Sequence, residues 1–594
     1  MVLEVEPASA GLLSGLIEQF KKDQTSTKPN FQQLKDGLPT LHFMSLSVYR
    51  GADYDPTFII EVNFDYEPGP FWAQFEAAIG DRVRPMLRCC KRPMDEAGPL
   101  YDAVTKEGSR YPIAPYLEQR TIEPSVYHHG NRGLSRDRIV REGVLFQAVS
   151  TELDKPSYRG TTAQQIHAQL RAAMLNQFDW LARPEEERIT RRERLSDIVR
   201  LFGVLLILLF VLSLPGFSFL VFLRAFFPAY ALWFVQDLYA LAWLLVLPLI
   251  VGGFLYWGRA ARPGEAASSR SGGLSPYVDS DLGSIGNLYT LILIGLVVVA
   301  AVALIFGVVG AAGVALYHVI AMPVAAGVSN AYVAGGGLLH ALVAAAKAFR
   351  SETEQAVRHF FPAFCTDWKS YFWVAFRVSL VGIYTAFFIS VPLILLWLRF
   401  LERRDSHHDA PEIDPYEMRK MTRREDWIPQ NHMGSVVLVK PGVLRMALFR
   451  TGHFALSLVL RVVATDGYLG TMRTVHFAHW AFINNGSRLM FVSNFDQTWD
   501  SYLDDFIEKA HGGLTLAWGS CTGFPATRFL VMDGASHGRQ FKAWARHSMA
   551  VSRFWYSAYT EFTVNQAERQ ARVAEGLRQK SLSSEKAAEW VKDL

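Results

Sequence analysis

The chain has 594 residues and a formal net charge of +4, and 50% of its residues are hydrophobic against 20% that are charged. This length fits two or three domains, and so small a net charge, without a zinc-finger spacing or a long basic run, argues against a nucleic-acid-binding protein. The four cysteines form no CxxC pair, so no metal site is predicted, and their scarcity is typical of a reducing compartment.

The first segment, residues 1–185, has the composition of an ordinary globular domain. Its start, MVLEVEPASAGLLSGLIEQF, lacks the basic and long apolar regions of a secretory signal peptide, so we expect this domain in the cytoplasm. A strand is predicted to begin at His42-Phe43, followed by a polar turn and a second strand that ends at Asn63-Phe64-Asp65. The run PFWAQFEAAIGDRVRPML then predicts an amphipathic helix.

Residues 186–404 are predicted to form the membrane region. A span needs about 20 mostly apolar residues, and four runs meet that length: residues 201–223, 238–257, 288–317 and 371–398. The stretch 318–350 is rich in Ala, Gly and Val, and either extends the third span, re-enters the membrane or lies along its surface. The pattern predicts a bundle of about four transmembrane helices.

The distribution of arginine predicts the orientation of these spans. Arginines stand at five positions within 188–200, at three within 259–270 and at three within 399–404, against Arg224 alone between the first two spans. Because cytoplasmic loops are enriched in Lys and Arg, both termini are predicted to be cytoplasmic.

The last part of the chain repeats the pattern of the first. A polar linker at 405–430 leads to a second α+β domain, residues 431–594, with a helical tail. In it VHFAHWAFINNGSRLMFVSNFD again runs from a His-Phe pair, His476-Phe477, to an Asn-Phe-Asp triplet that ends at Asp496. The fold prediction is therefore α+β plus membrane α-helical, with two related repeats at the chain ends that pack as a pair around a cleft.

A family resemblance rests on four runs within residues 431–565: NHMGSVVLVKPGVLR, HFAHW, RLMFVSNFDQTWDSYLDDFIEKA and WYSAY. With them the chain resembles a group of bacterial multi-spanning membrane proteins of unassigned function. The soluble parts of that group resemble the ferredoxin-like dimeric α+β barrel superfamily, which includes dye-decolourising peroxidases, chlorite dismutases and small monooxygenases. The resemblance implies a bacterial inner-membrane location and two ferredoxin-like copies.

Three histidines and one arginine are the candidate cofactor residues. His476 and His479 lie three apart, so on one strand they face opposite sides, and one of them is a candidate axial ligand for haem, the cofactor that the resemblance implies. His42 matches His476 in the repeat and would share its role, while Arg528 is a candidate anchor for a carboxylate or propionate. The alternative is that these histidines are hydrogen-bonded strand residues.

Four residues at the strand-to-helix junctions are predicted to have a structural role. Asn or Asp at such a junction caps a helix by accepting backbone N–H bonds. The candidates are Asn63, Asp65, Asn494 and Asp496.

Two functions remain open at this point. One is a membrane-anchored, peroxidase- or oxygenase-type redox enzyme that acts on a lipid-like substrate in the cleft. The other is a non-catalytic scaffold that binds lipid or a soluble protein partner at the membrane. Transport is disfavoured because the spans show no ring of charges. Paired sheets of this kind also favour a homo-oligomer.

Overall fold

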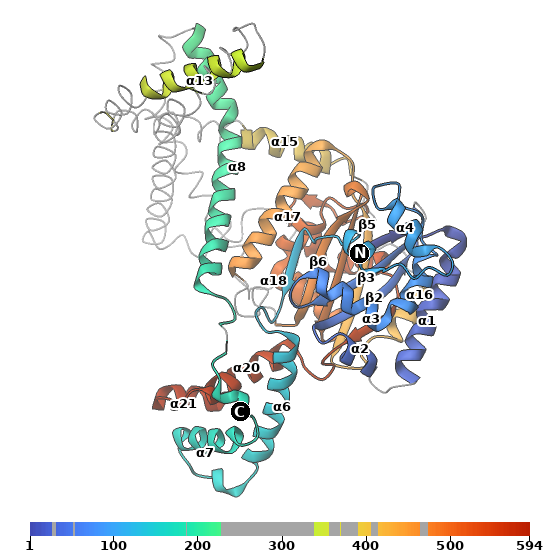
Figure 1. Ribbon diagram of the computed structural model, residues 1–594, viewed down its shortest axis with the longest axis vertical. Helices are drawn as coiled ribbons and strands as arrows, with labels where there is room; N and C mark the ends of the chain where they lie inside the picture. Colours follow the sequence, from blue (N-terminus) through green and yellow to red (C-terminus); the bar gives the residue numbers. More distant parts are fainter. Residues whose placement is uncertain are drawn as a thin grey trace. The chain divides into compact units, whose positions relative to one another are not determined.

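The computed structural model describes residues 1–26, 31–51, 54–185, 187–226, 323, 338–355, 367, 369, 390–405, 414–463 and 473–594. The chain divides into two compact units. One, the α+β unit, joins Met1–Phe202 to Leu398–Leu594, and the other is Gly203–Trp397. The two ends of the sequence thus build one unit (Figure 1).

The first sheet of the α+β unit takes strands from both ends of the chain. Its order is β1-β3-β2-β10, and all neighbours are antiparallel. Its strands are β1 (Val2–Glu4), β2 (Leu41–Tyr49), β3 (Thr57–Phe64) and β10 (Ser552–Ser557). The last strand therefore reaches the N-terminal sheet from the C-terminal end of the chain.

The second sheet also takes strands from both ends of the chain, and here one strand comes from the N-terminal half. Its order is β4-β6-β7-β5, again antiparallel. Its strands are β4 (Val126–His129), β5 (Gln430–Leu438), β6 (Val475–Ile483) and β7 (Arg488–Asp496). Read from β5, this order matches that of the first sheet, so each half contributes three strands to its own sheet and one to the other. Figure 1 shows the blue and orange strands side by side.

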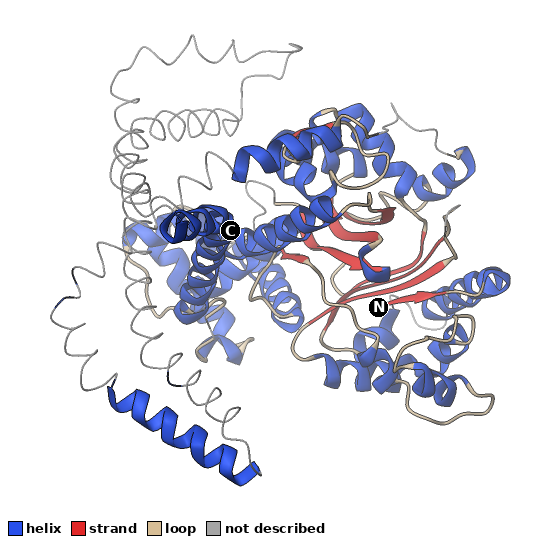
Figure 2. Cartoon of the chain, turned by 90° about the horizontal axis from the view of Figure 1, so that it is seen from above, coloured by secondary structure: helices blue, strands red, loops and turns tan. Residues whose placement is uncertain are grey.

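Each sheet is covered on one face by helices and on the other by the opposite sheet. The pattern of β2 shows why, since all nine of its residues are buried. Met44 and Leu46 pack into the core beneath the helices, whereas Tyr49 packs with Val436 and Met490 of the second sheet. Neither face of this strand is turned to water, as expected for an inner layer of such a fold. Figure 2 shows strands between helices on two sides.

The covering helices come from the corresponding segments of the two halves. α1 (Ala10–Ser26) and α3 (Pro68–Leu87) pack on the first sheet through side chains such as Ile17 and Phe75. The second sheet carries α17 (Val443–Val463), α18 (Trp499–Trp518) and α19 (Gly538–Ser548), and its core is rich in aromatic residues.

A separate helical cluster is shared equally between the halves. Its members are α6 (Arg136–Leu153), α7 (Ala163–Leu175), α20 (Val564–Arg578) and α21 (Ser584–Trp590). Thr162 and Thr563 begin α7 and α20 with capping boxes, which satisfy the first free N–H groups of each helix. The helices share one apolar core that includes Val573 and Trp590.

Shorter elements complete the α+β unit. They are α2 (Gln32–Gly37), α4 (Gly98–Thr105), α5 (Ala114–Gln119), α16 (Pro415–Thr422) and the hairpin β8 (Thr527–Arg528) with β9 (Met532–Asp533). Outside or crossing the boundary of the unit lie α8 (Arg191–Phe226), α13 (Leu338–Gln355) and α15 (Val391–Glu402).

The α+β part of the predicted fold class is confirmed, but the membrane part is wrong. The prediction did not include the exchange of β4 and β10 between the two α+β copies. The described part of the chain also shows no bundle of about four transmembrane helices. It contains two helices that are long and apolar enough to cross a membrane, Arg191–Pro215 and Val443–Val462.

The structure describes only part of the predicted spans, and it contains one further long apolar helix, α17, that was not predicted. The span 201–223 falls in α8, while 238–257, 288–317 and 371–389 lie outside the described residues. The C-terminal end of the fourth predicted span falls in α15, and residues 338–350 of the ambiguous stretch fall in α13. The second apolar helix, α17, packs Phe449 into the sheet core, with Leu456 and Leu460 against it, so this apolar run serves core packing.

Candidate functional site

A buried carboxylate lies between the two sheets. Glu61, in the middle of β3, has a side chain that is only 2% exposed. Five donors surround its two oxygens: Ser45 Oγ at 2.7 Å, His432 Nε2 at 2.7 Å, Asn494 Nδ2 at 2.8 Å, Asn63 Nδ2 at 2.9 Å and His479 Nε2 at 3.3 Å. A carboxylate offers about four lone-pair positions, so the hydrogen-bonding capacity of Glu61 is filled.

The register of the strands brings these donors together from both halves. Ser45 pairs with Glu61 across β2 and β3, and His432 pairs with Asn494 across β5 and β7. The repeat is not symmetric here, because His479 pairs with Val492 where the first sheet has Ser45 with Glu61. One half supplies the single carboxylate and the other supplies both imidazoles.

The electrostatics of this inter-sheet cluster favour an ionised Glu61. Burial raises the pKa of the Glu61 carboxyl, but the charge and hydrogen bonds of His432 and His479 outweigh burial and hold the pKa well below its usual value. His432 is fixed in turn by Ser552 Oγ, 2.5 Å from its Nδ1. An ionised carboxylate with every lone pair in use cannot take a proton from a substrate, so the geometry supports a structural tie between the sheets.

Two histidine–aspartate pairs lie near one end of the strands, at equivalent positions of the repeat. His42 Nε2 is 3.0 Å from Asp65 Oδ1, and His476 Nε2 is 2.8 Å from Asp496 Oδ1. The Nδ1 atom of His42 also lies 2.8 Å from the Tyr559 hydroxyl. Both histidine side chains are almost completely buried.

The second oxygen of each aspartate binds the start of a helix that is distant in sequence. Asp65 Oδ2 accepts a hydrogen bond from the backbone N–H of Arg136 at 2.7 Å, and Asp496 Oδ2 accepts one from Val564 at 2.8 Å. These are the first residues of α6 and α20. Each aspartate thus links a histidine on a central strand to the shared helical cluster.

The helices that directly follow these aspartates begin with other residues. Glu67 is the N-cap of α3 and makes no side-chain cap bond, whereas Thr498 caps α18 by accepting from the Ser501 N–H. The two candidate asparagines lie elsewhere, since Asn63 and Asn494 both donate to Glu61 in the inter-sheet cluster.

The predicted cofactor residues do not fit a haem. An axial imidazole must present a free ring nitrogen to the iron, but His42 and His476 direct Nε2 to aspartates, and Nε2 of His479 faces Glu61. The remaining Nδ1 of His476 has no partner, yet the side chain is fully buried. Arg528 lies on the β8–β9 hairpin and pairs with Asp533 at 3.3 Å. Within the described residues, no group of three or more His, Cys, Asp or Glu side chains is arranged to hold a metal ion.

Glu61 is the central residue that sequence reasoning missed. A single glutamate within TFIIEVNF carries no motif, although a lone charge between apolar strand residues is itself unusual. His432, in the run NHMGSVVLV, likewise belongs to no recognisable motif. Its role depends on Glu61, which is 371 positions away and cannot be paired with it from one sequence.

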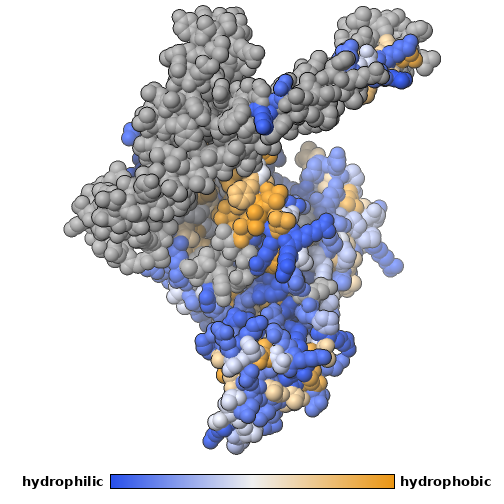
Figure 3. All heavy atoms as spheres, turned by 90° about the vertical axis from the view of Figure 1, so that its left-hand side faces the viewer, coloured by the Kyte–Doolittle hydropathy of each residue, from blue (hydrophilic) through white to orange (hydrophobic). Residues whose placement is uncertain are grey.

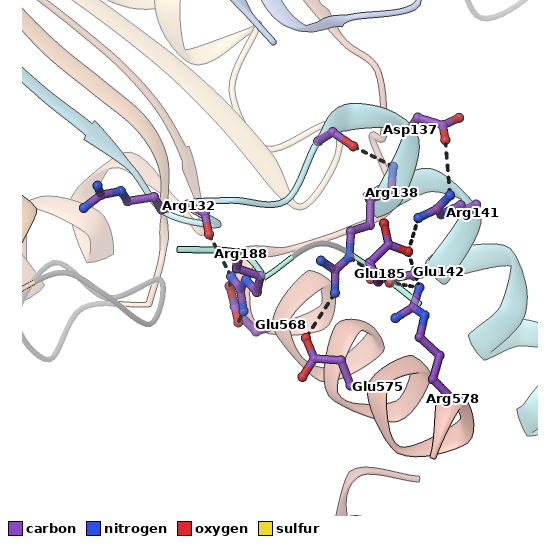
Figure 4. A network of polar contacts seen from close by, with 11 residues as sticks. Arg132, Asp137, Arg138, Arg141, Glu142, Glu185, Arg188, Glu568, Glu575 and Arg578 are labelled. Carbon is purple, nitrogen blue, oxygen red and sulfur yellow. Dashed lines mark hydrogen bonds and ion pairs between the residues drawn. The ribbon is translucent and has the colours of Figure 1, made fainter. Parts of the chain in front are cut away.

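The segment before α8 is clamped to the helical cluster by an arginine. Arg188 makes two hydrogen bonds to the buried Glu568 of α20, at 2.6 and 2.7 Å, and donates to the carbonyl of Arg132 (Figure 4). Beside it Glu142 of α6 accepts from Arg138 at 2.9 Å and from Arg578 at 3.0 Å. The chain leading to α8 is therefore tied to α20 and lies beside the paired charges of α6 and α20.

The side of α17 that points away from the sheet carries exposed apolar side chains. Val443 is 88% exposed and Phe454 is 53% exposed on this side, whereas Phe449 on the opposite side is buried in the sheet core. The C-terminal end of this helix lies beside the start of α8, because Arg132 binds both Asp197 and the carbonyl of Arg461. Apolar side chains also gather on the face of the molecule drawn in Figure 3.

Comparison of the chain with protein-family models, with curated proteins and with solved structures found no match. The resemblance to the ferredoxin-like superfamily therefore stays a prediction, and the function has to be argued from the geometry.

Proposed function

We propose that the protein is a non-catalytic binding module of a membrane surface, anchored by α8 and lying against lipid through the outer face of α17. The observation that carries this proposal is the exposure of Val443 and Phe454 on one side of a helix that is apolar enough to cross a membrane. Burying one such side chain contributes roughly 1.5–3 kcal/mol, so a bilayer would stabilise this face substantially.

The charges that flank the apolar segments support the same arrangement. Arginines at positions 191, 192, 194 and 200 precede or begin the apolar run of α8. Arg399 lies in the last turn of α15, and Arg403 and Arg404 directly follow that helix. Such residues favour the cytoplasmic side of a membrane. We accordingly propose that the α+β unit lies on the cytoplasmic face of a bacterial inner membrane.

The saturated inter-sheet cluster supports a binding module over an enzyme. Glu61 has no free lone pair, and His42 and His476 are held by aspartates in the protein interior. The redox function and its lipid-like substrate rest on the family resemblance alone. A structural core of this kind instead keeps the surface helices in fixed positions.

Lipid-depth quenching in nanodiscs tests this proposal on the full chain. Val443→Cys and Phe454→Cys are each labelled with bimane, and Met94→Cys is the control because Met94 is exposed on the N-terminal half. Cys89, Cys90 and Cys521 are buried, and Cys365 is replaced by serine so that only the introduced thiol reacts.

We expect nitroxide groups on the lipid acyl chains to quench labels at 443 and 454 and to leave the label at 94 bright. Equal, weak quenching at all three positions would overturn the proposal and would indicate that another protein surface covers α17.

A further inference from the structure

An apolar groove lies at the N-terminal end of α17. It has a volume of about 520 Å³ and is lined by Gly442, Val443, Met446, Ala447 and Arg450. These residues fall at spacings of three and four along the first turns, so they share one side of the helix. Apart from the arginine head group, every side chain that lines the groove is apolar.

Arg450 is held at the rim of this groove. Its guanidinium lies 5.7 Å from the centre of the Phe482 ring, and its Nη2 atom reaches within 2.6 Å of where a Cβ on Gly486 would stand. Gly486 has a φ of +87° in the turn between β6 and β7, a conformation that favours glycine. The absence of a side chain at this position also leaves space for the Arg450 guanidinium. The guanidinium therefore has a defined position.

The charge around the groove is not balanced. Lys440 and Arg445, at the same end of α17, already share the single carboxylate of Asp405 at 2.9 and 2.6 Å. No acidic side chain in the described part of the chain pairs with Arg450. Among the described residues Lys440 and Arg445 thus have a carboxylate partner and Arg450 does not, so the Arg450 guanidinium is available to an anion from outside.

We propose that this groove binds an acyl chain of an acidic phospholipid, whose phosphate is held by Arg450. The inference rests on the proposed membrane contact of α17 and deepens it by naming the lipid. Met446 suits a flexible apolar ligand because its side chain is unbranched and polarizable. A guanidinium fork matches the oxygens of a phosphate, and its apolar stem can lie along the chain below.

Native mass spectrometry of the full-length protein released from nanodiscs tests the proposal. The nanodiscs contain phosphatidylcholine with a minor fraction of phosphatidylglycerol of identical acyl chains, and retained lipid is counted for each species. Two variants alter the groove. Arg450→Gln removes the anion partner, and Ala447→Trp fills the apolar space from a position that is already exposed.

Two matched controls leave the groove intact. Arg461→Gln makes the same charge change on an exposed residue at the other end of α17, and Thr451→Trp adds the same bulk beside the groove but outside its lining. Any variant that fails to fold is detected by its melting temperature and is replaced by Arg450→Lys or Ala447→Phe.

We expect the wild type and both controls to retain phosphatidylglycerol above its share in the nanodisc. A charge-assisted contact predicts an about tenfold loss of that preference in Arg450→Gln, and Ala447→Trp should lose the retained lipid itself. Wild-type retention in both groove variants, or an equal loss in Arg461→Gln, would overturn the proposal.

These outcomes are distinguishable from failure of the proposed function. Quenching at positions 443 and 454 without any phosphatidylglycerol preference would remove the lipid site and leave the membrane contact of α17. An absence of quenching at both positions would remove the two together.

Discussion

His432 and Glu61 lie 2.7 Å apart across the two sheets, although 371 positions separate them in the sequence. The contact joins a strand of the C-terminal half to a strand of the N-terminal half, and His479 and Asn494 reinforce it from the same side. The interior between the sheets is therefore fastened by polar contacts as well as by the apolar cluster around Val436 and Met490. Removing either partner leaves polar groups buried without their partner.

Replacement of Glu61 by glutamine should destabilise the α+β unit. In the wild type, the two carboxylate oxygens of Glu61 accept from five donors. The glutamine amide keeps one acceptor oxygen but replaces the other with an NH2 donor, so the donors on that side lose their acceptor. We expect a loss of about 3 kcal/mol, measured as a fall in melting temperature of the detergent-purified protein. Ser47→Ala is the control, because it removes a buried hydroxyl of the neighbouring strand that does not bond to Glu61. Equal melting temperatures for the two variants would contradict the role given to Glu61.

Acid should destabilise the protein through buried neutral histidines. Burial lowers the pKa of His128 and of His453 to about 4. These folded-state values lie below the unfolded value of 6.5, so the unfolded chain takes up protons first as pH falls. The stability that the neutral rings contribute is complete above pH 6.5 and is lost between pH 6.5 and about 4.

The test compares melting temperatures at pH 7.5 and pH 5 for the wild type and His128→Leu. We expect each buried histidine to lower the free energy of unfolding by about 2 kcal/mol between pH 7.5 and pH 5. The His128→Leu variant should lack the part of this pH dependence that His128 causes. A variant with the same pH dependence as the wild type would show that other groups cause the acid sensitivity.

Arg188→Gln should loosen the connection between α8 and the helical cluster. The substitution leaves the buried carboxylate of Glu568 with Asn131 as its remaining side-chain partner. Backbone hydrogen exchange should become faster in residues 187–200 and in α20, because the free energy of local opening there falls by about 1–3 kcal/mol. Arg141→Gln is the control, since its partner Glu185 is more exposed than Glu568. Unchanged exchange in both segments would argue against the clamp.

Gly434→Ala should be strongly destabilising, because of a close approach between the sheets. A Cβ at this position would stand 2.0 Å from the Tyr49 hydroxyl, and the tyrosine ring cannot move aside within the packed layer. We expect a loss of about 1–3 kcal/mol from overpacking. Gly15→Ala in α1 is the matched control, since nothing lies within 4 Å of its Cβ position, and it should be neutral or slightly stabilising.

Some of this structure can be read from the sequence because its signals are local. Each half has a strand pair that begins at a His-Phe pair, His42 or His476, and ends at an Asn-Phe-Asp triplet. A short polar turn joins the two strands of each pair. The exchange of strands cannot be read in this way. β4 is a four-residue strand, VYHH, and nothing within it specifies that it pairs with β6 of the other half.

The candidate site was partly accessible for the same reason. His42 and His476 stand out because they repeat, but the sequence did not show that Asp65 and Asp496 hold them. The aspartates were read as caps of the next helix, whereas their second oxygens bind the starts of α6 and α20 far along the chain. Local capping rules describe neighbours in sequence, and these contacts are made in space.

The exchange of β4 and β10 also restricts the path of the intervening chain. Each sheet is complete only when strands from before residue 203 and after residue 397 meet in the same compartment. A chain that leaves a compartment through a bilayer and returns to it must cross the bilayer an even number of times. If the segment between the two ends enters the membrane, strand pairing therefore requires an even number of membrane crossings. This requirement does not depend on the charges that flank the spans.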